Sequence, residues 1–193
     1  VIVGISNQKR RKRQLSSIDE RGEQIVKEVE NINAYLIAGS NVVVNPQSKP
    51  LSQLPEMARG NSPTDGGHLI LEYGEIDELK LLEQDKDKFI KTFVGSKELI
   101  SGTSRFCIWV EDDDVAEAKS ITSIKSRIDS VKAFRECSKK KATVKAAGWP
   151  HRFDERKPIS SNSIICIPVI SSENRPYLPA GLLPAGTIVS NKA

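Results

Sequence analysis

Apolar residues recur at helical spacing in two stretches of the chain. The shorter stretch, 74–88, alternates isoleucine and leucine with charged residues. The longer stretch, 115–142, repeats its apolar residues every three or four positions, at Ile121, Ile124, Ile128 and Val131. This spacing is the period of one helix face. The pattern predicts a helix over each stretch, and the longer helix is expected to present a basic outer side through Lys125, Lys132, Arg135 and Lys139.

Short runs of β-branched and aromatic residues predict strands. They lie at 1–5, 42–44, 105–110, 164–169 and 182–189. Residues 7–31 are mostly polar and predict a loop or linker, and the prolines within 45–66 predict turns because proline lacks the backbone donor that regular structure needs. Grouped helices with strands before and after them predict an α+β fold, with a mainly antiparallel or mixed sheet and two principal helices.

Length and composition narrow the class of protein. The 193 residues suffice for one domain with a partial appendage, and 38% apolar and 28% charged residues are typical of a soluble globular chain. No apolar run approaches the roughly 20 residues of a membrane span. The three cysteines form no CxxC pair, and the two histidines have no partner at ligand spacing. This pattern predicts neither a zinc site nor a disulfide framework. It predicts buried thiols in a reducing compartment.

Positive charge is unevenly placed along the chain. Lysine and arginine exceed aspartate and glutamate by 29 to 25, giving a net charge of +4. One basic block lies at 9–13 and a second extends from 135 to 157, whereas residues 111–114 are acidic. Segregated positive charge is typical of proteins that bind polyanions. A solvated linker and a solvated helix face would explain either block alone equally well.

No catalytic constellation can be found in the sequence. The glycines of GNSPTDGGHLIL, residues 60–71, match neither the Walker loop nor the dinucleotide fingerprint. Gly66 and Gly67 therefore predict a tight turn with positive φ. GxSxG, HExxH and Cys-His signatures are also missing, and the acidic run at 111–114 is interpreted as a solvated loop. We predict no catalytic residue and no metal ligand.

Recognition chemistry is concentrated in SSENRPY, residues 171–177. Arginine can bind guanine, asparagine adenine and glutamate cytosine through base edges, while serine and backbone amides bind phosphates. An ordinary polar loop with an internal Glu-Arg pair is an equally good interpretation of these residues alone.

Four segments together resemble a known family. They are PEMARGNSPTDGGHLIL (55–71), FVGSKELISGTSRFCIWV (93–110), RIDSVKAFRECSKKKAT (127–143) and IPVISSENRPYLPAGLL (167–183). In this order and spacing they resemble the target-recognition domain of MmeI-like enzymes. Those are bacterial restriction-modification proteins that fuse a nuclease, an S-adenosylmethionine-dependent adenine methyltransferase and a recognition domain. The resemblance covers about residues 31–193.

The resemblance implies an arrangement of domains and partners. Residues 1–30 would be the end of a methyltransferase domain, with its last strand at 1–5, followed by a linker, and 31–193 would be the DNA target-recognition domain. The partners would be double-stranded DNA and upstream methyltransferase and nuclease domains of the same bacterial, cytoplasmic polypeptide. S-adenosylmethionine would serve the full-length enzyme only, and this chain would be non-catalytic and hold no cofactor.

The resemblance also assigns candidate contacts to DNA. The basic residues expected to bind phosphates are Arg135, Lys139, Lys140, Lys141 and Lys145. The residues expected to contact bases or set the register on DNA are Arg152, Ser171, Ser172, Glu173, Asn174 and Arg175. Two alternatives stay open at this point: a small stand-alone metal-dependent nuclease that uses the acidic run and the glycine turn, or a module that docks enzyme domains together.

Overall fold

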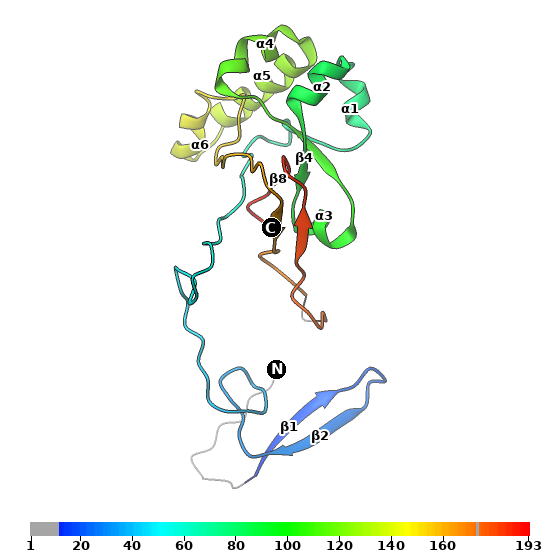
Figure 1. Ribbon diagram of the computed structural model, residues 1–193, viewed down its shortest axis with the longest axis vertical. Helices are drawn as coiled ribbons and strands as arrows, with labels where there is room; N and C mark the ends of the chain where they lie inside the picture. The colour runs from blue at the N-terminus through cyan, green and yellow to red at the C-terminus, as the bar shows by residue number, and fades with distance from the viewer. Residues whose placement is uncertain (1–11, 173) are drawn as a thin grey trace. The chain divides into compact units, whose positions relative to one another are not determined.

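The computed structural model describes residues 12–172 and 174–193 (Figure 1). Contacts between residues divide the chain into two compact units, Val1–Glu56 and Met57–Ala193. The strand predicted at 1–5 and most of the basic block at 9–13 lie outside the described residues. Each unit is described by itself.

The first unit contains a β-hairpin where the sequence predicted a linker. Strands β1 (Arg13–Ile18) and β2 (Gln24–Val29) pair antiparallel. The turn between them is closed by Asp19, whose carboxylate accepts hydrogen bonds from the backbone N–H groups of Arg21 and Glu23, each at 2.9 Å. The prediction of a loop over 7–31 is therefore wrong for the hairpin, because charged residues on both strands hid the β-branched positions.

The hairpin does not build a hydrophobic core. Every side chain of β1 and β2 is exposed or half-buried. The predicted strand at 42–44 is also wrong, since these valines have no regular structure and are exposed. In this unit the buried residue among those described is Asn33, whose side-chain oxygen accepts from the N–H groups of Tyr35 at 2.9 Å and Ile37 at 3.3 Å. Local hydrogen bonds, rather than burial of apolar surface, hold this segment.

A mixed four-stranded sheet forms the centre of the second unit. Its strand order is β3 (Ile70–Leu71), β5 (Arg105–Ile108), β4 (Ile90–Val94) and β8 (Ile188–Val189). The first two pairings are antiparallel and β4 pairs parallel with β8. A separate two-stranded sheet joins β6 (Ile164–Cys166) to β7 (Gly181–Leu183). One mixed sheet, two antiparallel pairs and several helices confirm the predicted α+β class, although the strand predicted at 182–189 is interrupted.

Both predicted helices are broken into shorter ones. The first becomes α1 (Glu75–Glu78) and α2 (Glu83–Phe89), separated by Lys80 with a φ of 49°. The second becomes α4 (Val115–Ser120), α5 (Thr122–Glu136) and α6 (Lys141–Ala146), and the break after α4 comes at Ile121, where the backbone is extended. A 3-10 turn, η1 (Asp112–Asp114), precedes α4, and α3 (Ser96–Ser101) follows β4. The sequence did not predict α3 or β4.

The predicted apolar stripe of the long helix lies in the core. Ile124, Ile128 and Val131 of α5 are fully buried and pack in one cluster with Leu69 and Leu71. Burying each such aliphatic side chain contributes about 1.5 to 3 kcal/mol. In Figure 1, α4 and α5 lie together at one end of this unit. The stripe thus anchors the helices to the sheet.

The GNSPTDGGHLIL segment forms the turn that its glycines predicted. Gly66 and Gly67 have φ values of 66° and 87°. A Cβ on Gly66 would lie 2.7 Å from the ring of Phe134, so a side chain at this position would force that ring to move. The buried carboxylate of Asp65 accepts the N–H of Leu69 at 2.6 Å. The buried Asn61 donates to the Val189 carbonyl at 3.0 Å. This segment therefore stabilises the fold through buried hydrogen bonds to the backbone.

The cysteines only partly match the prediction of buried thiols. Cys107 and Cys166 are buried, whereas Cys137 is exposed just after α5, so the prediction is wrong for that residue. Burial raises the pKa of both buried thiols, which makes them poor nucleophiles. No helix within the described ranges has the length and apolar character needed to cross a membrane.

Candidate nucleic-acid interface

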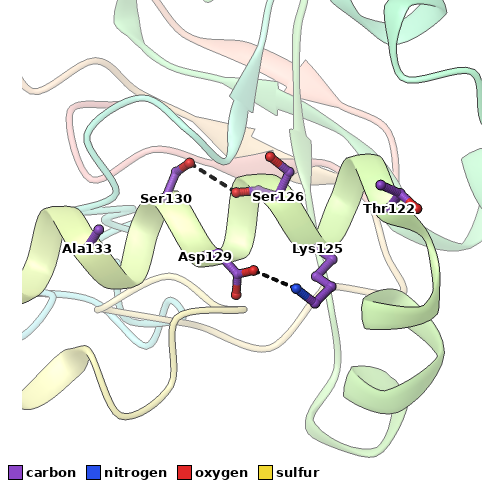
Figure 2. Close-up of a pocket in the computed structure, with 6 residues that line it drawn as sticks. All are labelled: Thr122, Lys125, Ser126, Asp129, Ser130 and Ala133. Atoms are coloured by element: carbon purple, nitrogen blue, oxygen red, sulfur yellow. Dashed lines mark hydrogen bonds and ion pairs between the residues drawn. The ribbon is translucent and has the colours of Figure 1, made fainter.

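The outer face of α5 is not the free basic surface that the sequence predicted. Figure 2 shows this face, where the Lys125 amine lies 2.9 Å from the Asp129 carboxylate. One turn further on, Lys132 lies 3.8 Å from Glu136. These i,i+4 pairs neutralise the charge of both lysines locally. The hydrogen bond with Lys125 lowers the pKa of Asp129, so the pair stays ionised at neutral pH.

Arg135 lies inside the protein and cannot contact a phosphate in this structure. Its side chain is fully buried. Its N–H groups donate at 2.8 to 3.1 Å to five backbone carbonyls, those of Pro63, Thr64, Ala146, Trp149 and Arg152. A guanidinium has five N–H donors, so none is left for DNA. The expected phosphate contact is wrong for this residue.

The sequence contained a signal for this burial. Arg135 follows Val131 by four positions and so continues the stripe of Ile124, Ile128 and Val131 on the inner side of α5. An arginine on an apolar stripe is expected to be buried only when its charge is satisfied. Counting arginine simply as a basic residue concealed its position on the helix.

The lysines around α6 do form an exposed basic group. Lys139, Lys140, Lys141 and Lys145 are all exposed, while Thr143 and Ala146 turn the other face of α6 inward. Among the described residues, none of these four lysines has a carboxylate partner. We call them the α6 lysines. Uncompensated positive charge on a short segment attracts polyanions.

Arg152 lies in a loop that the acidic run holds in place. Asp112 accepts from Arg152 and lies beside Nε2 of His151, at 2.7 Å in both cases. The hydrogen bond with His151 and the nearby arginine charge lower the pKa of Asp112. The Arg152 guanidinium also lies 5.5 Å from the centre of the Trp149 ring. The interpretation of 111–114 as a merely solvated loop is wrong, because Asp112 orients the predicted DNA-contact residue.

Arg156, in the same loop, contacts the protein itself. Arg156 donates to the Val110 carbonyl at 3.0 Å, pairs with Glu111 and covers the Trp109 ring at 4.3 Å. Trp109 in turn packs edge-on against Phe153 at 5.4 Å. Cation–π and aromatic contacts of this kind fix side chains at a surface. The loop is therefore held by contacts with residues 109–112 at both Arg152 and Arg156.

Apart from Arg152, the predicted base-contact residues lie in the connection between β6 and β7. Ser172 and Asn174 are exposed, and Ser171 and Arg175 are half-buried. The Ser172 carbonyl accepts the Arg175 N–H at 3.2 Å and its hydroxyl accepts the Asn174 N–H at 3.3 Å, so the segment is a turn. Glu173 lies outside the described residues.

The structure places these candidate residues in two groups. In Figure 1, α6 lies on the side of the helices, whereas the β6–β7 connection reaches to the opposite end of the same unit. The α6 lysines and Arg152 belong to the first group and the serines, Asn174 and Arg175 to the second. A single partner that contacts both groups has to reach from α6 to the β6–β7 connection.

Comparison with known proteins decides the family. The family model described as "MmeI, target recognition domain" matches residues 38–193. The chain belongs to the MmeI target recognition domain family. The resemblance drawn from the four sequence segments is thereby confirmed.

Two longer proteins are similar to this target recognition domain. It is 38% identical over 169 residues to "DNA methyltransferase A" of Bacillus subtilis (strain 168), a match that covers 88% of this chain and 19% of that protein. It also matches the solved structure of the Type IIL restriction-modification enzyme MmeI in complex with DNA, with a TM-score of 0.79 and 31% identity over 96% of this chain. The chain spans about a fifth of the first relative and 25% of the second.

The exposed groups of the target recognition domain are donors and acceptors that suit binding. Within the described part of the chain, no three histidine, cysteine, aspartate or glutamate side chains cluster in a way that could hold a metal ion. The carboxylates of the acidic run instead contact basic side chains of the neighbouring loop and, through Asp114, Lys88 at 2.8 Å. What the exposed groups can do chemically is to bind phosphates and base edges.

Proposed function

We propose that this domain reads the base sequence of double-stranded DNA, with the α6 lysines binding phosphates. The observation that carries the proposal is the group of four exposed lysines without a described acidic partner, in a member of a target recognition family. The matched MmeI enzyme was solved in complex with DNA, which supports the same ligand here. Phosphate contacts set the position of a protein on the duplex but carry no sequence information.

Sequence reading is assigned to the second group and to Arg152. Ser171, Ser172, Asn174 and Arg175, together with the neighbouring Glu173, provide donors and acceptors that can discriminate base edges. Two of the described members are exposed, and their turn presents several polar groups within a few residues. Arg152 already donates a hydrogen bond to Asp112, and a phosphate or guanine could replace that carboxylate.

The whole protein is proposed to be a site-specific adenine methyltransferase within a fused restriction-modification enzyme of the bacterial cytoplasm. The Bacillus relative is named a DNA methyltransferase and MmeI a restriction-modification enzyme, and both names support this proposal. S-adenosylmethionine would be its methyl donor. The present chain has neither a glycine-rich cofactor loop nor an Asn-Pro-Pro-aromatic motif, so no step of methyl transfer is assigned to its residues.

Residues 1–30 are proposed to belong to the end of the methyltransferase domain, with 31–193 as the recognition domain. The family match begins at residue 38, and the hairpin before it buries none of its described side chains. The coding region upstream provides the check. A glycine-rich motif and an Asn-Pro-Pro-Tyr type motif encoded there would support the assignment, and their absence would contradict it.

Charge reversal tests the phosphate contacts. The double variant Lys141→Glu and Lys145→Glu, made in the full-length protein that contains these residues, should weaken binding to a random-sequence duplex by about a hundredfold at roughly 0.1 M salt, because each reversed lysine repels the phosphate that it had neutralised. Lys125→Glu with Lys132→Glu is the matched control, since it changes net charge equally on the outer face of α5. Equal loss in both variants would mean that α6 is not the phosphate contact.

A further inference from the structure

Two of the α6 lysines, Lys141 and Lys145, lie in a helix too short to be stable alone, and Lys139 and Lys140 directly precede it. α6 has six residues and buries two side chains, Thr143 and Ala146. Isolated helices of this length are not stable in water. The place of the lysines is therefore set by the contacts that tie α6 to the rest of the unit.

Arg135 provides the tie at the carboxyl end of α6. One of its terminal nitrogens donates to the carbonyl of Ala146, the last residue of the helix, at 2.9 Å and to that of Trp149 at 3.1 Å. The last carbonyls of a helix have no partner within it, and a positive charge beside them is favourable. The second terminal nitrogen reaches the Arg152 carbonyl at 2.8 Å. One side chain thus binds the end of α6 and the loop that carries Arg152.

The same guanidinium connects both segments to the core. Its Nε and second terminal nitrogen donate to the carbonyls of Thr64 and Pro63, each at 2.9 Å. These residues belong to the glycine turn that leads into β3, and Arg135 itself extends from α5. Acceptors from three separate backbone segments therefore meet on one buried charge.

We infer that Arg135 is a positioning residue for DNA binding, which fixes the α6 lysines and Arg152 relative to each other before DNA arrives. The inference rests on the proposed function of the α6 lysines. Charges that are already in place lose less conformational freedom when they bind, so more of the attraction is realised as affinity. Arg135 acts entirely through backbone atoms and does not touch the DNA.

Arg135→Lys in the full-length protein tests the inference. Lysine keeps the charge but has three donors on one nitrogen, so it cannot bridge five carbonyls in three segments. Affinity for a random-sequence duplex pool is measured between about 50 and 200 mM salt. The slope of log affinity against log salt should become shallower by about 1 or more, which corresponds to the loss of at least one phosphate contact.

Arg127→Lys is the matched control. Arg127 lies on the same helix, donates to the His68 carbonyl at 3.1 Å and pairs with Glu75 at 2.8 Å. His68 directly follows the glycine turn and Glu75 is the first residue of α1. Within the described residues, Arg127 therefore has no hydrogen bond to α6 or to the Arg152 loop. This variant should leave the salt slope unchanged.

Coupling to a lysine separates positioning from a general loss of binding. In the parent protein Lys141→Ala should make the slope shallower by about 1. In the Arg135→Lys background the same substitution should change it little, because the misplaced lysine already contributes nothing. If Lys141→Ala has its full effect in both backgrounds, Arg135 does not position α6.

Hydrogen exchange distinguishes a local effect on α6 and the Arg152 loop from a requirement of the whole fold. In Arg135→Lys the amides of 141–152 should exchange at least about tenfold faster, with a smaller change in β4 and β5. An equal rise throughout the unit, or complete unfolding, would make Arg135 a requirement of the whole fold and overturn the inference. If Lys141→Ala and Lys145→Ala leave DNA binding of the parent unaltered, the proposed phosphate contact is wrong and the inference falls with it.

Discussion

The outer face of α5 and the α6 lysines are made of the same basic residue types but differ in what surrounds them. On α5, Lys125 and Lys132 each lie four residues before a carboxylate and pair with it. Around α6 the lysines follow one another with alanine, threonine and valine between them, so no acid is at hand along the helix. The comparison teaches that the spacing of acids between lysines, rather than the number of lysines, decides which basic helix face is free for a polyanion.

Arg135→Met is expected to have the largest effect on stability. It removes the buried charge on the inner side of α5, whereas the basic residues of the outer face are exposed. Five carbonyls would lose their donor at once. The free energy of unfolding should fall by about 3 to 5 kcal/mol, measured by urea denaturation. Lys132→Met, on the outer face, should change it by less than about 0.5 kcal/mol. Similar changes in the two variants would contradict the buried role.

Arg175→Ala tests the second group of contacts, away from both helices. In the full-length protein it should relax or change the methylated sequence at one position, with a loss of discrimination of about 1 to 3 kcal/mol. Methylome sequencing of a host that carries the variant measures this. Affinity for random-sequence DNA should fall much less. An unchanged methylation pattern would remove Arg175 from the reading residues.

Lys141→Ala and Lys125→Ala sharpen the comparison itself. Lys141→Ala should weaken DNA binding several-fold and reduce the salt slope by about 1, equally for all sequences. Lys125→Ala should leave the slope unchanged because Asp129 already neutralises that lysine. Titration of a labelled duplex at several salt concentrations measures both. A larger slope change for Lys125→Ala would reverse the assignment of the two faces.

The smallest effect is expected from the α5 pair on stability. Lys125 and Asp129 are both more than half exposed, and exposed i,i+4 pairs contribute only a very small part of a domain's stability. Lys125→Ala should therefore lower the free energy of unfolding by no more than that small part. Thermal melts at low and high salt provide the measurement, and the difference should vanish at high salt. A salt-independent loss would show that Lys125 stabilises α5 by another contact.

The sequence predicted those features that depend on local spacing. The stripe from Ile124 to Val131 and the positive φ of Gly66 and Gly67 follow from periodicity and from the steric freedom of glycine, and the structure confirms both. The break at Ile121 was not predicted, since the three-and-four spacing continues across it. The hairpin β1–β2 was concealed by its charged residues.

The candidate site depended more on contacts between distant residues. That the α6 lysines are exposed could be predicted from the run of three at 139–141 with Lys145 one helical turn further on. The partners of Arg135 and Arg152 could not, because the Thr64 carbonyl is 71 residues and Asp112 40 residues away along the chain. Such pairings are decided by the tertiary fold, and the resemblance to the family supplied the ligand class that the residues alone left open.

The two-stranded sheet of β6 and β7 has a consequence for how readily the domain tolerates substitution. The segment between these strands is anchored by three residue pairs of its own and lies outside the four-stranded sheet. Substitutions at its tip therefore leave the packed aliphatic cluster of α5 and β3 intact. Under the proposed assignment of base contacts to this segment, a few replacements there would change the target sequence at little cost to folding.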